Sequence, residues 1–498
     1  MKLLERLSRY IDASFPIVYI NSFEETMIDT IIKQASGRRE ILEWNYVNGF
    51  TNFETKNSYN LADTTLSNTL RLLLKGEELE GKILVLRDIS SVLQEADVIA
   101  LLKCIAEKIC MGNIQCTIIL VSVTRNFPKE LEPYITLVEP DYLETEDIRT
   151  IIKNFLEEYP QLLDTSQELL EEMAISFKGL SQFEIENILA LAYEKDGELK
   201  KEDLKLIFEQ KQQMIMKSGI LEMIPLKERF EDIGGLENLK RWLKRKGKVL
   251  KNVEKAAAFG VDVPKGVLLA GVPGCGKSLN AKAAANLFGI PLLRMDMGRL
   301  MGKYIGESEA NLQRAIKQAE AIAPCVLWID ELEKAFSGIG GLGGGTDVTT
   351  RLFGNFLTWL QEKNSPVFVV ATANDIIKLP PELLRKGRFD EIFYIGLPNE
   401  AERKRIFEIH ISKRRKQDLD KLDLNKLVKK TKGYSGADIE WVIKESVEMA
   451  YFLDKKALTM EDILEAIEHT HSLSEIMKEP LERMSKEYEN RKFKNASA

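Results

Sequence analysis

The chain has 498 residues, 44% of them hydrophobic and 30% charged, and its 70 basic and 77 acidic side chains give a net charge of −7. This length predicts about three domains, and the negative balance argues against general coating by nucleic acid. No apolar run reaches the ~20 residues that cross a bilayer, and charged residues interrupt the N-terminal segment, so we expect neither a membrane span nor a signal peptide.

Cysteine and histidine usage excludes several kinds of site. The five cysteines form no CxxC pair and the three histidines form no HExxH motif. This argues against a disulfide scaffold, a zinc site and a zinc protease. Small buried thiols in a reducing compartment are the simpler interpretation, so we expect the cytoplasm, or a reducing organelle matrix, as the location.

The first half of the chain alternates strand-like and helical segments. Apolar runs begin at Pro16, Lys82 and Cys116, and the second of them ends at Asp88. This alternation is typical of an α/β domain with a parallel sheet. It predicts an α/β domain over 1–140, a helical lid-like subdomain over 141–215 and a linker over 216–229.

The turn after the first strand-like run is unsuited to phosphate. Residues 21–25 contain no glycine and two carboxylates, and Ile89 follows Asp88, so no Asp-Glu pair ends the second run. A glycine-free turn cannot easily bring its backbone amides onto a phosphate, and carboxylates repel one. We therefore expect no ATP binding in this half, and a role in docking, oligomer contacts or substrate capture.

A basic segment opens the second half. Residues 239–255 carry eight basic side chains and one acidic one. A solvated helix face is one interpretation, and contact with a partner or with nucleic acid is the other. The sequence leaves both open.

The strongest motif is a phosphate-binding loop. The apolar run 266–270 leads into GVPGCGKS, which extends from Gly271 to Ser278, and a helical pattern follows. Gly271, Gly274 and Gly276 permit the close approach of backbone N–H groups to phosphates. Lys277 supplies a positive charge to the β- and γ-phosphates of a nucleotide, and Ser278 supplies a hydroxyl for Mg²⁺. The helix that follows adds its N-terminal dipole.

Polar side chains end the next two apolar runs. Asp330 and Glu331 follow a run that begins at Cys325, and Asn374 ends the run after it. A charge at the end of a buried strand is costly unless it is compensated, and Mg²⁺ would compensate Asp330. Glu331 is then positioned as the general base for the attacking water, and Asn374 as the group that orients this water.

The two halves resemble each other. The run that ends at Asp88 resembles the run that ends at Asp330. Pro140 and Pro398 begin similar segments 258 positions apart, and Gly179 and Gly433 lie in similar segments 254 positions apart. Offsets this close over several segments indicate an internal duplication, although chance similarity of two α/β segments is the alternative.

The motifs of residues 229–475 together resemble those of AAA ATPases such as katanin, spastin and the proteasomal ATPases. They are FEDIGGLENLK, GVPGCGKS, KYIGESEANL, LWIDELEKAF, ATAND and LLRKGRFDEIF, in this order. The resemblance implies an α/β P-loop AAA+ domain over 230–397, a helical lid over 398–475, a polar tail that frays over 476–498, and a homo-oligomer, typically a hexamer. The layout with a motif-less, degenerate AAA-like first half resembles an AAA family encoded in algal plastid and cyanobacterial genomes.

The resemblance assigns further roles. Asp232, Ile233 and Gly234 would line the adenine pocket, and His410 would lie near the ribose and adenine. Arg385 and Arg388 match the arginine fingers that reach the γ-phosphate of a neighbouring subunit. Two small residues of the lid, Gly436 and Ala437, would approach the nucleotide. The phosphate-binding loop would contact the nucleotide along its length, through Gly271, Val272, Pro273, Gly274, Cys275, Gly276, Lys277, Ser278 and Leu279.

Two loops match the channel-facing parts of the family. Tyr304, Ile305 and Gly306 match the first pore loop, in which an aromatic side chain grips an extended polypeptide, and a turn tyrosine packed on its own domain is the alternative. The glycine-rich run 338–345 lies where a second pore loop would run. Cys275 departs from the family's threonine, and its place at a helix N-terminus beside Lys277 predicts an acidic thiol whose alkylation blocks ATP binding.

The sequence thus predicts an Mg-ATP-dependent AAA ATPase that remodels or unfolds a protein substrate through a ring. The first half would select the client or adaptor. A nucleotide-switched regulatory scaffold that binds a partner without threading it is the alternative. A nucleic-acid-linked ATPase is a third reading, favoured only by the basic segment, and contact with nucleic acid is not expected.

Overall fold

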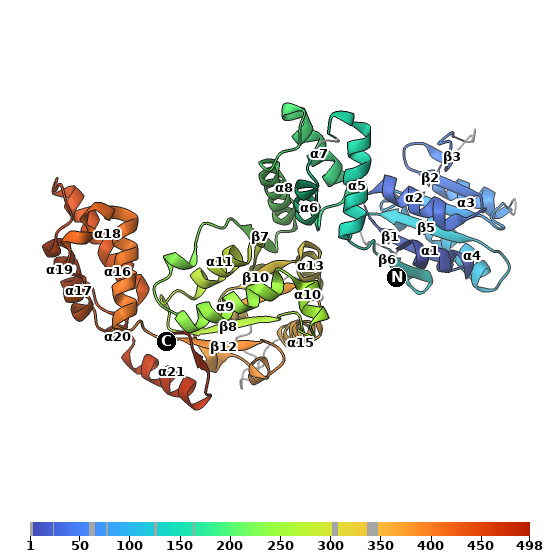
Figure 1. The fold of residues 1–498 in the computed structure, drawn as a ribbon. Coiled ribbons are helices and arrows are strands. Elements are labelled where there is room, and N and C mark those ends of the chain that lie inside the picture. The colour runs from blue at the N-terminus through green and yellow to red at the C-terminus, as the bar shows by residue number, and fades with distance from the viewer. Residues whose placement is uncertain are drawn as a thin grey trace. The chain divides into compact units, whose positions relative to one another are not determined.

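The computed structural model describes residues 3–22, 24–58, 65–75, 78–123, 127–162, 165–300, 307–335 and 347–498. The chain forms two compact units that divide between Asp203 and Leu204 (Figure 1). Tyr304, Ile305 and Gly306, and the glycine-rich run 338–345, lie outside the described residues. No helix in the described part of the chain combines the length and the apolar character needed to cross a membrane.

The first unit is built on a six-stranded sheet in the order β3-β2-β4-β5-β1-β6. All neighbours are parallel except β2 and β3. The central strands are nearly continuous apolar runs because helices cover both faces of a parallel sheet. The strands are β1 (Ile17–Asn21), β2 (Ile41–Asn45), β3 (Gly49–Asn52), β4 (Ile83–Arg87), β5 (Thr117–Ser122) and β6 (Ile135–Val138); the helices are α1 (Leu3–Asp12), α2 (Glu25–Ser36), α3 (Leu66–Lys75), α4 (Ala96–Cys110), α5 (Thr145–Glu158), α6 (Gln167–Phe177) and α7 (Gln182–Asp196).

The second unit contains a seven-stranded sheet in the order β13-β12-β8-β11-β10-β9-β7. Only the β7–β9 pair is antiparallel. Its strands are β7 (Leu221–Ile224), β8 (Gly266–Gly271), β9 (Leu292–Met295), β10 (Cys325–Ile329), β11 (Val367–Ala373), β12 (Glu391–Ile395) and β13 (Lys494–Asn495).

Helices flank this sheet and form a separate lid, at the far left of Figure 1. Those of the large domain are α8 (Asp203–Ser218), α9 (Glu237–Leu250), α10 (Val253–Ala258), α11 (Lys277–Phe288), α12 (Met297–Leu300), α13 (Glu307–Ile322), α14 (Leu332–Ala335) and α15 (Asp347–Glu362). The lid consists of α16 (Glu400–Arg415), α17 (Leu424–Lys430), α18 (Gly436–Phe452) and α19 (Met460–Glu468), and α20 (Leu473–Ile476) and α21 (Lys478–Asn490) follow it.

The internal duplication is visible in the strand order. The run β6-β1-β5-β4-β2 of the first sheet matches β12-β8-β11-β10-β9 of the second, strand for strand in chain order. The lids match as well, because Ser181 and Ser435 each cap a helix through a capping box, α7 and α18 respectively. Gly179 and Gly433, two residues before these caps, have φ angles of 86° and 87°. Both halves are therefore copies of one α/β-plus-lid plan.

The C-terminal tail is docked, which corrects the expectation of a fraying helix. Strand β13 pairs with β12, and the Ala496 carbonyl accepts hydrogen bonds from the backbone N–H groups of Asn238 and Leu239. The ring of Tyr488 stacks on that of Tyr394 with centroids 4.1 Å apart. The apolar side chains of α21, which are spaced at helical intervals, provide the buried face that holds the tail in place.

Candidate active site

The loop between β8 and α11 has the backbone that its glycines predict. Gly274 and Gly276 have φ angles of 73° and 87°, in the left-handed region that favours glycine. A Cβ atom at Gly274 would lie 2.9 Å from the Cβ of Ala437, so the lid passes directly over the loop. The N–H group of Ala437 donates to the Gly274 carbonyl at 3.0 Å. The loop is thus held between the sheet and the N-terminus of α18.

Lys277 is buried at the start of α11. Its Nζ donates to the carbonyls of Gly271 and Val272 at 2.9 and 2.8 Å. Burial lowers the pKa of this lysine to about 8, although nearby acidic groups, including Asp330, oppose the shift. A buried cation at a helix N-terminus, beside a glycine-rich loop, is a suitable partner for an anionic ligand.

Three oxygen-bearing side chains meet at the ends of the strands. Asp330, which directly follows β10, accepts hydrogen bonds from the hydroxyls of Ser278 at 3.1 Å and Thr372 at 2.5 Å. Strands β10 and β11 pair in parallel, which brings Thr372 beside Asp330. The described residues contain no cluster of three histidine, cysteine or acidic side chains that could hold a metal. One carboxylate and two hydroxyls are oxygen ligands of the kind that suits Mg²⁺, which binds through one or two protein oxygens together with substrate phosphates and water.

Glu331 and Asn374 face each other at the same edge. The Asn374 Nδ2 donates to the Glu331 Oε1 at 3.2 Å, and the Glu331 N–H donates to the Thr372 hydroxyl at 3.0 Å. Glu331 has a φ of 52°, which is rare for a residue with a side chain and is characteristic of residues held in place by their surroundings. Glu333, which the sequence did not single out, accepts from the Asn374 N–H at 3.1 Å. Burial raises the pKa of Glu333.

The loop before α9 approaches the lid helix α16. A Cβ atom at Gly234 would lie 2.6 Å from the side chain of Ile406, and one at Gly235 would lie 2.3 Å from that of Glu402. The two glycines of this motif are therefore required by close packing under the lid. Asp232 forms an ion pair with Lys413 at 3.2 Å. The backbone N–H of Arg229 and then Lys413 hold its pKa below the usual range, against the effect of burial.

His410 lies on α16 and faces α18. Its Nδ1 is 3.7 Å from the Glu440 carboxylate, and burial lowers its pKa, against the effect of that carboxylate. Within the described residues this Nδ1 has no hydrogen-bond partner. The imidazole is therefore held largely neutral, with a polar atom available to a ligand.

One cavity of about 480 Å³ brings these groups together. Gly271 and Val272 do not line it: Val272 is buried and a Cβ at Gly271 would lie 2.1 Å from the Ile395 carbonyl, so both are packed against β12. Arg385 and Arg388 also lie outside it. Predicted residues that line it are Asp232, Ile233, Gly234, Pro273, Gly274, Cys275, Gly276, Lys277, Ser278, Leu279, Asp330, Glu331, Asn374, His410, Gly436 and Ala437; lining residues that the sequence did not single out are Leu236, Lys282, Trp328, Thr372, Gly396, Pro398, Glu402, Ile406 and Glu440.

The predicted acidic thiol at Cys275 is wrong. Burial raises the pKa of this thiol to about 12, and Lys277 only partly opposes the shift. The sequence places the thiol at a helix N-terminus but does not show that the lid covers it. Alkylation of Cys275 at neutral pH is therefore expected to be slow.

The first unit contains a different set of charges at the matching strand end. Asp88 has a φ of 51° and is followed by the buried Ile89, just as Glu331 has a φ of 52° and is followed by the buried Leu332. Asp88 therefore corresponds to Glu331, which corrects its sequence-based match to Asp330. Arg87, whose side chain is only 5% exposed, then stands where the second unit has Asp330, and it forms ion pairs with Asp29 and Glu43.

A carboxylate also replaces the phosphate-binding loop of the first unit. Glu24 precedes α2, and burial raises the pKa of its carboxyl group, although the backbone N–H groups of Phe183 and Gln182 at the start of α7 oppose this shift. These two residues match Ala437 and Gly436 of the second unit. The carboxyl group of Glu24 thus lies at the N-terminus of α7, the position that matches the contact between the phosphate-binding loop and α18 in the second unit.

Comparisons with known proteins agree with this architecture. The family described as ATPase family associated with various cellular activities (AAA) matches residues 267–397, and the AAA+ lid domain matches residues 421–465. The SpoVK-like AAA ATPase N-terminal domain matches residues 3–140, and the second domain of the same group matches residues 146–218.

Whole-chain relatives have the same layout. The chain is 36% identical over 503 residues to the AAA domain-containing protein ycf46 of Pyropia yezoensis, with 100% of both chains covered. It is 37% identical over 480 residues to ycf46 of Guillardia theta, with 95% and 92% covered. A cell division cycle protein 48 homolog of Archaeoglobus fulgidus is 38% identical over 242 residues, which are 48% of this chain and 33% of the relative. The predicted resemblance is confirmed: the chain belongs to the AAA ATPases, among the ycf46 proteins with SpoVK-like N-terminal domains, and is an ATP hydrolase.

Proposed function

We propose that this ATPase remodels protein substrates, hydrolysing Mg-ATP in the second unit of each chain within a hexameric ring. The observation that carries the proposal is the meeting of Ser278, Asp330, Glu331 and Asn374 at one sheet edge, at the N-terminus of α11. Ser278 and Asp330 would hold Mg²⁺, which neutralises charge that develops on the phosphates.

The other side chains around the cavity would bind the nucleotide and activate the attacking water. Lys277 and the N–H groups of the loop bind the phosphates, and the lid closes over them through Gly436 and Ala437. Glu331 accepts the proton of the attacking water, and Asn374 fixes the carboxylate and the water in line. The base and sugar lie between the Asp232–Gly234 loop and His410, where the cavity is bounded by α16.

A ring would add the arginines of a neighbouring copy to each nucleotide site and would form the channel for the substrate. Arg385 and Arg388 lie outside the cavity of their own chain, so they would act on the phosphate bound by a neighbouring copy, where guanidinium groups are typically worth ~10³–10⁵ in rate. Tyr304, with Ile305 and Gly306, would grip the polypeptide in the channel. The first unit, whose sequence contains no phosphate-binding loop motif, would select the client or adaptor. The cytoplasm or the plastid stroma is the proposed location.

The test begins with a trapped form. Glu331→Gln should bind ATP without hydrolysing it and capture clients from an extract in ATP but not in ADP. Unfolding of a captured client by the otherwise wild-type chain is then compared with that by Tyr304→Ala. We expect Tyr304→Ala to lose unfolding while its basal ATPase rate stays within about twofold, because the tyrosine grips the client and not the nucleotide.

The matched control is Tyr451→Ala, which removes an 85% exposed tyrosine from the end of α18. It should unfold the client at the wild-type rate. Client binding that switches with the nucleotide but is never followed by unfolding, in wild type and variant alike, would instead support the nucleotide-switched scaffold.

A further inference from the structure

Helix α9 presents a row of cations to solvent. Arg241, Lys244, Arg245 and Lys248 follow one another at helical spacing, and all four are exposed. Within the part of the chain that the structure describes, none of them forms an ion pair, whereas Lys246 on the flank of the helix is paired with Asp390 at 3.4 Å. We call these four residues the basic face. Four unpaired like charges on one helix repel each other unless an anionic partner covers them.

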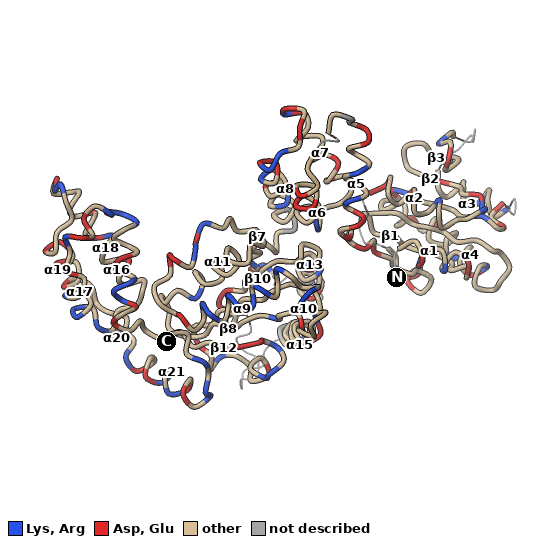
Figure 2. The backbone as a smooth tube through the Cα atoms, viewed as in Figure 1, with Lys and Arg blue, Asp and Glu red and all other residues tan. Residues whose placement is uncertain are grey.

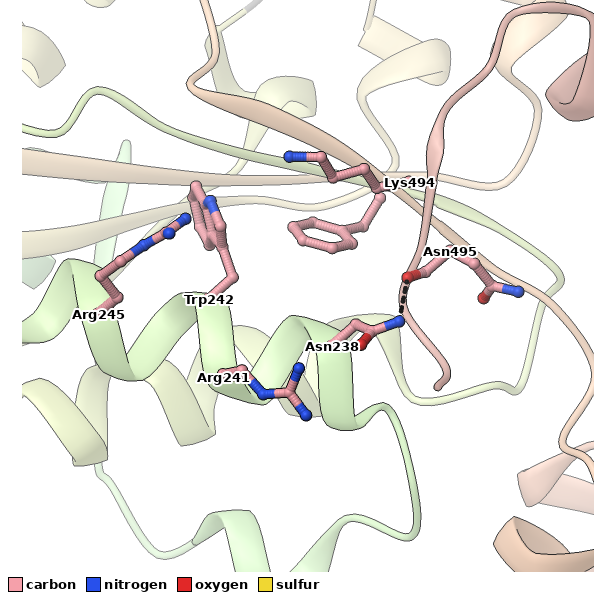
Figure 3. Close-up of a pocket in the computed structure, with 7 residues that line it drawn as sticks. Asn238, Arg241, Trp242, Arg245, Lys494 and Asn495 are labelled. Carbon is pink, nitrogen blue, oxygen red and sulfur yellow. Dashed lines mark hydrogen bonds between the residues drawn. The ribbon is translucent and has the colours of Figure 1, made fainter.

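The basic face borders a cavity of about 460 Å³ between α9, β12 and β13. Figure 3 shows Arg241, Trp242 and Arg245 extending from α9, with Lys494 and Asn495 across the cavity. Trp242 and Phe393 form its buried apolar floor, with ring centroids 5.6 Å apart. This site therefore offers an apolar depression edged by cations, which suits an apolar side chain flanked by carboxylates.

The chain itself contains a surface of the opposite character. Residues 141–203 carry 17 acidic and 6 basic side chains, a net charge of −11, so the rest of the chain has a net charge of +4. Figure 2 shows the acidic positions along α5, α6 and α7.

Helix α7 displays both features that the cavity requires. Phe183 and Leu191 are 61% and 51% exposed on α7, and Glu186 and Glu194 are exposed on the same side of the helix. Neither glutamate forms an ion pair among the described residues. We call these four residues the acidic face. Its glutamates span eight residues, about 12 Å, and the basic face spans seven, about 10 Å, at 1.5 Å per residue.

We propose that the acidic face of one copy docks on the basic face of a second copy, with an apolar side chain of α7 in the cavity floored by Trp242. The inference rests on the proposed ring, because head-to-tail contacts around a closed ring let the acidic face of every copy meet the basic face of the next copy. The charges steer and align the two helices, and the apolar contact excludes water. The contact thereby assigns the first unit a role in assembly.

A second copy fits the observations better than nucleic acid does. Nucleic acid binding through bases needs exposed aromatic rings for stacking, and Trp242 and Phe393 are only 7% and 2% exposed. The whole-chain charge of −7 also repels a polyanion, whereas docking of the acidic face matches the observed exposure of Phe183 and Leu191.

The test uses charge reversal in the full chain. Arg241→Glu/Arg245→Glu and Glu186→Lys/Glu194→Lys are each prepared, and sedimentation velocity is run with Mg-ATP at low salt. We expect the wild type to sediment as a ring that weakens as salt rises, and each variant to sediment as smaller species. An equal mixture of the two variants should recover the ring, because alternating copies again place opposite charges at every interface.

The control Arg483→Glu/Lys486→Glu makes the same change of charge on two exposed cations of α21 and should leave the ring intact. A ring that persists in Arg241→Glu/Arg245→Glu, or a mixture that does not recover it, overturns the inference. Binding of a fluorescent single-stranded oligonucleotide that this variant abolishes, with sedimentation unchanged, overturns it in favour of nucleic acid. A wild type that forms no ring under any nucleotide condition refutes the proposed function instead.

Discussion

Thr372 is the residue that joins Asp330 and Glu331. Its hydroxyl donates to Asp330 at 2.5 Å and accepts from the Glu331 N–H at 3.0 Å. Its side chain is only 1% exposed, and buried polar groups of this kind depend on such protein partners for their hydrogen bonds. Its two hydrogen bonds fix the position of Asp330 and the unusual backbone of Glu331.

Thr372→Val tests this role. The change keeps the side-chain shape and removes both hydrogen bonds, and loss of such a supporting contact typically costs ~10–100-fold in activity or metal affinity. We expect kcat to fall by about that factor, with a higher Mg²⁺ requirement, while ATP binding stays within about threefold.

The matched control is Thr431→Val, a fully buried threonine in the lid whose hydroxyl donates only to the Leu427 carbonyl at 2.9 Å. Steady-state ATPase rates across a Mg²⁺ titration separate the two variants. Equal rates for Thr372→Val and wild type would show that Asp330 is positioned without the threonine.

At this scale the sequence predicted the residues that belong to one motif. Lys277, Asp330 and Asn374 could be assigned to the nucleotide site because residue type and order along the chain are enough to identify them. Thr372 could not, because its role depends on the register between β10 and β11. Cys275 was misjudged for a related reason: the lid that buries its thiol is distant in sequence.

At the scale of elements, the first unit replaces ligand charges with its own side chains. Arg87 at the end of β4 contacts Asp29 from α2 and Glu43 from β2, and Lys56 also pairs with Glu43 at 2.6 Å. Arg87 and Glu43 are 5% and 3% exposed. A guanidinium therefore ties together β4, α2 and β2, the elements that match β10, α11 and β9 of the second unit.

Arg87→Met should weaken this unit by about 3 kcal/mol, because it removes a buried cation from Glu43 and leaves that carboxylate with the 47% exposed Lys56. Arg87→Met/Glu43→Leu should recover most of this loss, since an apolar pair of similar volume needs no charge compensation. Hydrogen exchange of the β4 and β5 amides in the full chain measures the opening free energy.

Arg149→Met is the control: its ion pair with Glu171 is about 40% exposed on both sides, and such pairs contribute under ~1 kcal/mol. An Arg87→Met variant whose β4 amides exchange like those of the wild type would mean that Lys56 alone compensates Glu43.

The strands and the parallel sheets that they form were predictable because apolar runs alternate with helices in both halves. The match between Asp88 and Asp330 was not, because aligning identical letters conceals a one-residue shift that only the backbone angles of Asp88 and Glu331 reveal. The docked tail was missed because its buried face depends on Tyr394, which is distant in sequence.

At the scale of the whole molecule, two copies of one α/β-plus-lid plan have diverged into different tasks. The second unit has the phosphate-binding loop motif. The first unit has the same strand order, but the end of its strand β4 carries Arg87 in ion pairs with Asp29 and Glu43. The composition could not show this division. The average charge of −7 combines a −11 segment with a remainder of +4.

The central claim is that an ATP site in the second unit is completed by arginines from a neighbouring copy. Glu331→Gln lacks the base, and Arg385→Ala/Arg388→Ala lacks the arginines, so each alone should lose at least ~10²-fold in ATPase rate while still binding ATP. When the two are mixed and allowed to exchange subunits, the intact Glu331 of one copy meets the intact arginines of the other. We expect the mixture to recover a substantial fraction of the wild-type rate, and a mixture no faster than the mean of its components would contradict the claim.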